Sequence, residues 1–416
     1  MAVTPRAVSS YLVPTDAYHI DSSRISDNAL QVITTLQKAN FGAYLVGGAV
    51  RDLLRNNTPK DFDVATEAKP DDIVSLFKRA KIIGRRFKIV HVYFPREIIE
   101  VTTFRGKSTP ELSDRSANRS IDANGLLIRD NVFGSIDHDA SRRDFTCNAL
   151  YFDPTHQRLY DFYHGLDSIK SRVLKMIGDP ESRFVEDPVR ILRAVRFCSK
   201  LGFAMDKPII DAIPLAKPLL DVIPPSRRFD EALKLVLSEH APLHVKHLHT
   251  FALMPFLFPT LTENLSPSAS RLIELTLANT QQRLRAGKSV TPAFILAAFL
   301  WPRLQAAEKK QPKLSNEQTY ATHVLNEQMH YTAMSKRVQA SILAIWHLQQ
   351  PLLTQHSLPK AHRVAEHPKF RAAYDFLLLR EQSGEFLNHA GDFWTHYQKD
   401  QPVAPVVRKP RRSFTH

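Results

Sequence analysis

Cysteine is almost absent from this sequence, which has only Cys147 and Cys198 among its 416 residues. The two lie far apart in the chain, and neither belongs to a paired-cysteine or metal-ligand motif. A disulfide framework and a zinc site are therefore not expected, and a reducing compartment suits the chain.

Long apolar runs are missing as well. The longest, residues 293–301, is far shorter than the roughly 20 residues that a membrane-spanning helix needs. Residues 1–10 lack the long apolar core of a secretory signal peptide. We therefore expect a protein of the cytoplasm with no membrane span.

Acidic residues are too few to balance the basic ones, which leaves a formal charge of +14 and a pI of about 9.7. An excess of this size favours a polyanionic partner, either nucleic acid or an acidic membrane surface. A basic protein without such a partner is the alternative. Residues 401–416 carry four Lys or Arg and no acidic side chain, which indicates a basic flexible tail.

The apolar pattern divides the chain into two kinds of structure. After an irregular start over residues 1–25, helical spacing of apolar residues follows Ser26, a plausible N-cap. Short strand-like runs then alternate with helices, one of them built on residues 73–80, so this half is predicted to be α/β or α+β. The predicted strands are residues 44–46, 61–65, 88–94, 98–104, 149–152 and 159–162.

Beyond about residue 180 the strand pattern stops. Leu, Ala and Arg recur at three- and four-residue spacing with prolines between them, which predicts an all-helical second half. The polar stretch 106–125 is predicted to be a surface loop.

A glycine pair, Gly47 and Gly48, lies between a predicted strand and a predicted helix. Without side chains, the pair lets backbone N–H groups approach a phosphate, and the helix N-terminus adds a partial positive charge. Arg51 in the first turn is placed to reach the same anion. The alternative for the pair alone is a tight turn that binds nothing.

Two aspartates, Asp61 and Asp63, follow at strand spacing. Alternate residues of a strand share a face, so the two carboxylates should point the same way while Phe62 points into the core. Such a pair can hold Mg²⁺ through oxygen ligands, and two ions can activate a hydroxyl and neutralise a leaving pyrophosphate. A lone pair of this kind is more often a solvated edge strand. The preceding glycine pair and Arg-Asp helix make this one specific.

A third acid, Glu100, lies in an otherwise apolar, β-branched strand. Burying an acid there is costly unless it is paired or bound to a metal. The alternative, the exposed face of an edge strand, stays open.

Clustered cations accompany these acids. Arg142, Arg143 and Asp144 together suit a triphosphate and a ribose hydroxyl, or else form a surface ion-pair cluster. Further on, Asp187 precedes a helix start at Pro188, and a stripe of like charge on that helix favours an anionic partner. The stripe consists of Arg190, Arg193 and Arg196.

Two further segments contain clustered polar or charged residues. Residues 78–88 hold six basic side chains and no acid, which is typical of a nucleic-acid or phosphate contact. The dipeptide His138-Asp139 has no accompanying ligands at hydrolase-like spacing, so we interpret it as structural.

These motifs, in this order, resemble those of the bacterial poly(A) polymerases and tRNA CCA-adding nucleotidyltransferases. The resemblance implies an α+β nucleotidyltransferase head, with a mixed β-sheet and helices, followed by all-α neck and body domains. It implies metal ligation by Asp61 and Asp63, catalysis by these two and Asp144, and nucleotide contacts from Gly47, Gly48, Arg51, Arg142, Arg143, Asp187, Arg190, Arg193 and Arg196. The implied domains are an extension (1–25), a catalytic head (26–170), a nucleotide- and RNA-binding neck (171–262), an RNA-binding body (263–392) and a tail (393–416).

Three runs, residues 82–92, 223–233 and 366–375, are similar to the poly(A) branch. The resemblance extends from about residue 10 to about residue 390, and the tail looks shorter and less basic than is typical of that branch. It implies transfer of AMP from ATP to RNA 3′ ends with Mg²⁺, and RNA-decay proteins as further partners. CCA addition to tRNA is the alternative within enzymes, and a catalytically silent RNA-binding module is the alternative outside them.

Overall fold

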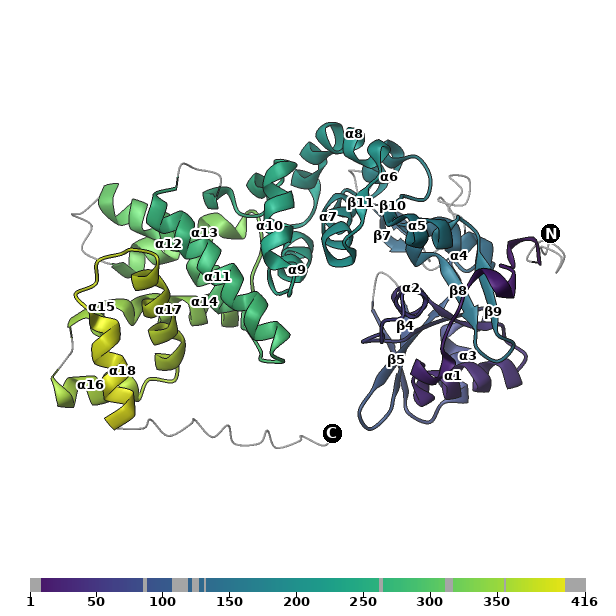
Figure 1. Ribbon diagram of the computed structural model, residues 1–416, viewed down its shortest axis with the longest axis horizontal. Helices are drawn as coiled ribbons and strands as arrows, with labels where there is room; N and C mark the ends of the chain where they lie inside the picture. Colours follow the sequence, from purple (N-terminus) through teal and green to yellow (C-terminus); the bar gives the residue numbers. More distant parts are fainter. Residues whose placement is uncertain are drawn as a thin grey trace. The chain divides into compact units, whose positions relative to one another are not determined.

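The computed structural model describes residues 9–84, 88–106, 119–121, 127–130, 132–261, 265–310, 317–354 and 357–400. The chain forms two compact units, Met1–Leu219 and Leu220–His416 (Figure 1). Residues 85–87 of the basic run, most of the predicted loop and the basic tail 401–416 lie outside the described residues. The domain limits that the resemblance implies stay predictions.

The first unit contains a mixed seven-stranded sheet in the order β3-β4-β5-β2-β1-β8-β9. Strands β2 and β5 are parallel, whereas every other neighbouring pair is antiparallel. This confirms the α+β head. The strands are β1 (Ala43–Val46), β2 (Asp63–Thr66), β3 (Ala80–Ile83), β4 (Ile89–Tyr93), β5 (Ile98–Thr103), β8 (Leu150–Asp153) and β9 (Arg158–Asp161).

Three local predictions are wrong. The helix expected over residues 73–80 is α3 (Pro70–Leu76), and it ends because Phe77 is extended and Ala80 already belongs to β3. Part of the predicted loop forms β6 (Arg119–Ile121), which pairs with β7 (Leu127–Asp130). The region beyond residue 180 also contains one short strand, β11 (Ala204–Met205), paired with β10 (Val173–Leu174). Each of these strands is defined by its pairing with another strand rather than by its own apolar pattern.

The two faces of the sheet are covered by different helices. Helix α1 (Asp27–Lys38), capped by Ser26 as predicted, buries its apolar stripe and contacts β1, β2 and β5. On the face that carries Val46 and Ala65, α4 (Ile136–Arg142) packs with Tyr151 in one core cluster. Asp63 is paired opposite Val46, so it shares this second face.

Four helices complete the first unit. They are α5 (Gly165–Ser171), α6 (Pro180–Glu186), α7 (Val189–Leu201) and α8 (Lys207–Ala216). As predicted, α7 begins directly after Pro188, and it ends at Gly202, whose positive φ of 64° suits a helix C-terminus. Helix α2 (Gly48–Leu54) follows β1.

The second unit is helical throughout the residues that the structure describes, in agreement with the prediction. Its α-helices are α9 (Pro225–Val236), α10 (Ala241–Thr250), α11 (Pro267–Arg285), α12 (Pro292–Lys310), α13 (Glu317–Met329), α14 (Lys336–His347), α15 (Gln349–Thr354), α16 (Leu358–Ala365), α17 (Phe370–Gln382) and α18 (Ala390–Asp400). The apolar run 293–301 lies within α12, which packs against α11, α13 and α14. Among the described helices, none has the length and apolarity required to cross a bilayer.

Candidate active site

The predicted metal acids lie where β2 begins. Asp63 is the first residue of β2, and Asp61 precedes the strand, while Phe62 is buried between them as predicted. The parallel pairing of β2 with β5 sets Asp63 opposite Glu100, and the antiparallel pairing of β5 with β4 sets Glu100 opposite His91. Since paired residues share a face of a sheet, Asp63, Glu100 and His91 lie on one side.

Negative charge is concentrated at Asp63. Burial, followed by the charge of Glu100 and then of Asp61, raises the pKa of the Asp63 carboxyl to about 6, against an opposing effect of Arg143. Within the described residues, the side chains of Asp61 and Asp63 have no hydrogen-bond or ion-pair partner, and the charge of Arg143 only partly offsets the effects that raise the pKa of Asp63. A bound cation would stabilise a carboxylate pair in this environment.

Glu100 has a different environment. Its strand, β5, lies between β4 and β2, so the alternative of an edge strand is wrong. The Glu100 side chain is 48% exposed and its Oε1 lies 3.4 Å from His91 Nε2. No three acidic, histidine or cysteine side chains are grouped as a complete metal site in the part of the chain that the structure describes. Asp61 and Asp63 fit a divalent ion only as part of a ligand set that substrate and water oxygens complete.

A buried hydrogen-bonded triad holds Arg143 beside these acids. Arg143 Nη2 donates to Asp139 Oδ2 at 3.1 Å, and Arg143 Nε donates to the Tyr151 hydroxyl at 2.9 Å. Tyr151 in turn donates to Asp139 Oδ2 at 2.6 Å. Asp139 and Tyr151 are buried, so the three side chains fix one another. The structural interpretation of the His138-Asp139 dipeptide agrees with these contacts.

The glycine pair lies next to this arginine. Gly47 has a φ of +72°, a conformation that L side chains rarely adopt, and a Cβ there would lie 3.4 Å from Arg143 Nη1. Gly48 begins α2. Glycine at position 47 is therefore required by the backbone conformation, and it also leaves room for Arg143.

Arg51 does not point into open space. Its side chain is 2% exposed and donates to Asp52 and to the side-chain oxygen of Asn148. These contacts give Arg51 a role in holding the segment around Asn148. The predicted contact of Arg51 with a nucleotide stays a prediction.

The two arginine motifs come together at Asp144. Asp144 Oδ1 accepts from Arg190 Nε at 2.8 Å, and Asp144 Oδ2 accepts from Arg193 Nε. Burial raises the pKa of the Asp144 carboxyl, but Arg193 and Arg190 outweigh it, so the net shift is downward. The arginine stripe on α7 thus has a counter-charge within the protein, namely Asp144. The sequence alone had favoured an external anion as the partner of this stripe.

Further contacts fix this cluster. Arg190 Nη1 donates to Glu186 Oε2 and to the carbonyl oxygen of Arg183, each at 2.8 Å. The Arg183 guanidinium donates to the backbone carbonyls of Arg142 and Arg143 at 2.9 and 2.8 Å. The side chain of Asp187 accepts from the backbone of Val189 at the start of α7. Arg142 Nη1 donates to the carbonyl of Gly106 at 2.8 Å.

Sequence reasoning missed three side chains of this region, namely Tyr151, Arg183 and Phe197. The ring of Phe197 has the guanidinium carbon of Arg196 at 4.5 Å and that of Arg193 at 5.6 Å from its centroid. Such contacts hold arginine side chains over an aromatic face. Only the i, i+4 spacing of Asp139 and Arg143 could have indicated part of this network in advance.

Three parts of the chain match family models of known proteins. Residues 43–175 match the family model of the poly A polymerase head domain, residues 202–265 that of a probable RNA- and SrmB-binding site of polymerase A, and residues 308–409 that of the polymerase A arginine-rich C-terminus. The first match contains Asp61, Asp63 and Asp144.

Relatives match over most of the chain. Poly(A) polymerase I of Salmonella typhi is 41% identical over 403 residues, which cover 94% of this chain and 86% of that protein. A CCA-adding enzyme of Lactobacillus helveticus is 36% identical over 213 residues, only 51% of this chain and 50% of that protein. The crystal structure of Bacillus stearothermophilus CCA-adding enzyme in complex with CTP shares the fold, with a TM-score of 0.60, 24% identity and coverage of 90% and 82% of the two chains.

The near full-length match distinguishes the two branches of the resemblance. It lies with the poly(A) polymerases, whereas the match to the CCA-adding relative covers about half of the chain. Nucleotidyltransferases of this family use divalent metal ions. The chain therefore belongs to the bacterial poly(A) polymerases, which are polynucleotide adenylyltransferases.

Proposed function

We propose that the first unit transfers AMP from ATP to RNA 3′ ends at Asp61 and Asp63, and that these two acids hold Mg²⁺. The observation that carries the proposal is a carboxylate pair whose side chains have no hydrogen bond or ion pair among the described residues, and in which burial and Glu100 raise the pKa of Asp63 to about 6. A bound divalent ion supplies activation of the 3′-hydroxyl and neutralisation of the leaving pyrophosphate.

The reaction is a displacement at phosphorus. The RNA 3′-hydroxyl oxygen forms a bond to the α-phosphorus of ATP, the bond from that phosphorus to the bridging oxygen breaks, and pyrophosphate leaves. The hydroxyl proton passes to solvent or to a nearby base. Arg143 lies close enough to lower the pKa of Asp63, so its charge also acts on phosphate oxygens that approach these acids.

Asp144 acts in this proposal by placing two arginines. It holds Arg190 and Arg193 through their Nε atoms. Arg193 remains 33% exposed, and among the described residues its Nη groups make no hydrogen bond, so they are available to a phosphate or a ribose. A direct catalytic role for Asp144 is part of the same proposal, as are nucleotide contacts from Gly47, Gly48, Arg51, Arg142 and Arg196.

The preference for one nucleotide depends on whether the side chains near the base can change their hydrogen-bond partners. From the family resemblance, we propose that Asp187 and Arg190 lie near the base edge. Arg190 is 6% exposed and bonded to Asp144, Glu186 and a backbone carbonyl. A guanidinium with these partners cannot readily re-pair, which supports one preferred nucleotide, ATP, throughout extension.

The experiment is incorporation of each of the four nucleotides onto an unstructured RNA and onto tRNA lacking its 3′ end, followed by sequencing of the product. Long adenosine runs support the proposal. Two cytidines and one adenosine on tRNA would identify the CCA-adding alternative instead. A protein that binds RNA but incorporates no nucleotide would be the silent module.

Further proposals rest on sequence alone. We propose a cytoplasmic location because the sequence has few cysteines, and both of them are free and buried. Association with RNA-decay proteins and an RNA-binding role of the helical neck and body belong to the same family-based proposal.

A further inference from the structure

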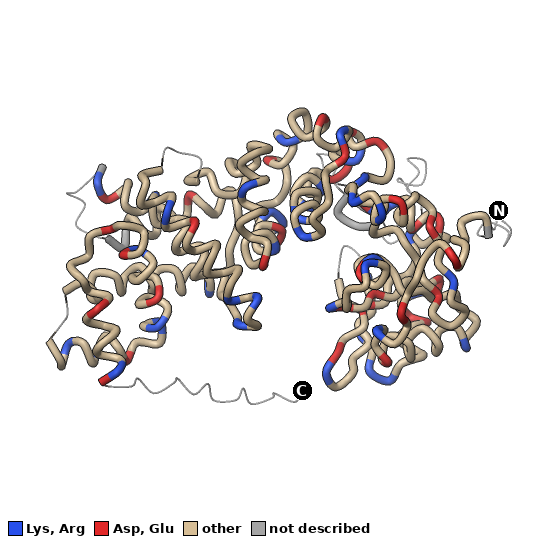
Figure 2. Tube along the Cα trace, viewed as in Figure 1, with Lys and Arg blue, Asp and Glu red and all other residues tan. Residues whose placement is uncertain are grey.

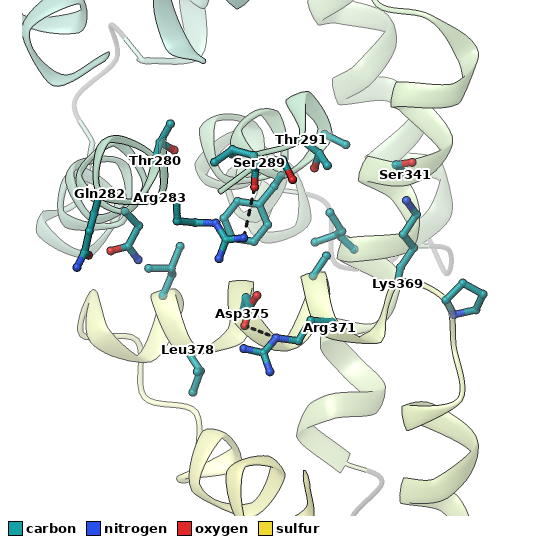
Figure 3. A pocket seen from close by; sticks show the side chains of 18 of the residues that line it. Thr280, Gln282, Arg283, Ser289, Thr291, Ser341, Lys369, Arg371, Asp375 and Leu378 are labelled. Carbon is teal, nitrogen blue, oxygen red and sulfur yellow. Dashed lines mark hydrogen bonds and ion pairs between the residues drawn. The ribbon is translucent and has the colours of Figure 1, made fainter. Parts of the chain in front are cut away.

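A cavity of about 530 Å³ lies within the second unit, among α11, α12, α14 and α17 (Figure 3). Its volume is within the range of about 300–1,000 Å³ that is usual for small-ligand sites. None of its lining residues belongs to the proposed transfer site, which lies in the first unit. Its charged side chains are Arg283, Lys369, Arg371 and Asp375.

Positive side chains outnumber negative ones in this cavity. Three cations line it together with one acid. Figure 3 shows Arg283 of α11 donating to the carbonyl oxygen of Ser289, at 3.3 Å. On α17, Arg371 pairs with Asp375, with 3.0 Å between Arg371 Nε and Asp375 Oδ1. Burial raises the pKa of the Asp375 carboxyl despite the opposing charges of Arg371 and Arg283. Three cations beside one acid leave the cavity with a net positive charge, which attracts an anion.

The remaining wall is partly apolar and partly amide. Phe294 lines the cavity and is held edge-on by Phe376, with 6.4 Å between ring centroids and 84° between ring planes. Asn279 and Gln282 add amide groups that can donate and accept hydrogen bonds. An aromatic ring, paired amides and guanidinium groups are the combination that recognises a base and its phosphate.

We infer that this cavity binds one nucleotide of the RNA chain, with the base against the wall that contains Phe294 and the phosphate at Arg283 and Arg371. The inference rests on the proposed function, because it takes RNA as the substrate. A phosphodiester carries one negative charge, which two guanidinium groups can neutralise beside Asp375. A free triphosphate carries more negative charge than three cations and one acid can neutralise.

Positive side chains are not confined to this cavity. Figure 2 shows Lys and Arg distributed over both units, with acids among them. A test must therefore separate the cavity from general attraction to RNA. Arg285 provides the matched control, because it is exposed and lies on the same helix as Arg283 but does not line the cavity.

The binding experiment measures the dissociation constant of the full chain for a labelled oligoadenylate. Arg283→Gln and Arg371→Gln should each weaken binding roughly tenfold, the effect of losing a charge-assisted hydrogen bond. Arg285→Gln should change it by about twofold or less. Asp375→Asn should tighten binding by about fivefold, because it removes a charge that repels the phosphate. Equal losses in Arg283→Gln and Arg285→Gln, or weaker binding by Asp375→Asn, would overturn the inference.

Photocrosslinking distinguishes the source of the nucleotide. An azidoadenosine placed within the RNA should label peptides of α11, α12 or α17, and Arg283→Gln but not Arg285→Gln should reduce the labelling. Labelling by free azido-AMP alone would overturn the assignment to RNA. AMP transfer to a saturating, very short primer, measured in parallel, should be unchanged in the cavity variants. If the native protein itself transferred no AMP to this primer, the proposed function would be refuted instead.

Discussion

Asp144 accepts a hydrogen bond from Arg190 Nε at 2.8 Å, and this contact joins the end of the α4 segment to helix α7. Asp144→Ala would leave a buried Arg190 without its main counter-charge. Breaking a buried ion pair costs about 3–5 kcal/mol, so we expect a loss of this order in the free energy of unfolding, measured by urea denaturation. Asp211→Ala is the control, because Asp211 pairs with Lys207 on the surface, where such pairs contribute about 0–1 kcal/mol.

The same contact predicts a pH dependence. The pKa of Asp144 is lowered in the folded protein, so its contribution is present above the ordinary aspartate pKa and is lost as the pH falls through the folded pKa. The stability difference between the native protein and Asp144→Asn should therefore shrink as the medium becomes acidic. A difference that grows on acidification would contradict this assignment of charge.

Removing either proposed metal acid should abolish AMP transfer. We expect Asp61→Ala and Asp63→Ala to lose transfer while RNA affinity stays nearly unchanged, since neither residue needs to contact the RNA backbone. The measurement is extension of a labelled primer at saturating Mg²⁺, with Asp71→Ala on α3 as the control. Ordinary turnover by either variant would show that the metal site lies elsewhere.

A substitution at Asp63 that abolishes AMP transfer should nevertheless make the metal-free protein more stable. The pKa of Asp63 is raised to about 6 because burial and then Glu100 disfavour its charge. Ionisation in the folded state therefore destabilises the metal-free protein as the pH rises above the ordinary aspartate range. Asp63→Asn should increase the free energy of unfolding in EDTA at neutral pH by up to about 3 kcal/mol, the equivalent of a pKa rise from 3.8 to about 6. The gain should disappear in acid, where the carboxyl is neutral, and a gain that persists there would have another cause.

Tyr151→Phe tests the triad that holds Arg143. The ring is retained but the hydroxyl that joins Arg143 and Asp139 is lost, leaving buried polar groups with fewer partners. We expect a loss of about 1–3 kcal/mol in stability together with a lower kcat. Tyr160→Phe is the control, because Tyr160 packs edge-on against Tyr44 and its hydroxyl has no hydrogen bond to the described residues. Equal effects in both variants would mean that the Tyr151 hydroxyl contributes nothing specific.

Salt should weaken RNA binding steeply. Each phosphate contact with single-stranded RNA changes the log–log slope of affinity against salt by roughly −0.7, because condensed counterions are released. With a formal charge of +14, several contacts are expected. The slope is measured by anisotropy over a salt series. A flat series would mean that the positive charge serves another partner.

Local patterns predicted much of the first unit. The period of two around Phe62 correctly placed that side chain in the core, and the helical period after Ser26 located α1 together with its cap. Both features depend on neighbours a few residues away, which is why one sequence was sufficient to predict them. The enzyme family was predictable for another reason, because its motifs occur in a fixed order between Gly47 and Arg196.

Long-range partners were not predictable in the same way. The short strand β11 is defined by its pairing with β10, in which Ala204 lies opposite Val173, 31 residues earlier in the chain. Arg51 looked available to an anion because its partner Asn148 is 97 residues away. The cavity residues Arg283 and Asp375 come from helices that are far apart in sequence, so no motif joins them.

The link between Asp144 and α7 also has a consequence for how the enzyme is made. Asp144 lies 46 residues before Arg190 and 49 before Arg193, and the acids Asp61 and Asp63 are earlier still. A nascent chain that has completed the sheet still lacks both guanidinium groups that Asp144 binds. Until α7 is synthesised and docked, the carboxylate has no arginine partner from that helix. Synthesis therefore delays assembly of the proposed active site until a segment well beyond the strands has been added.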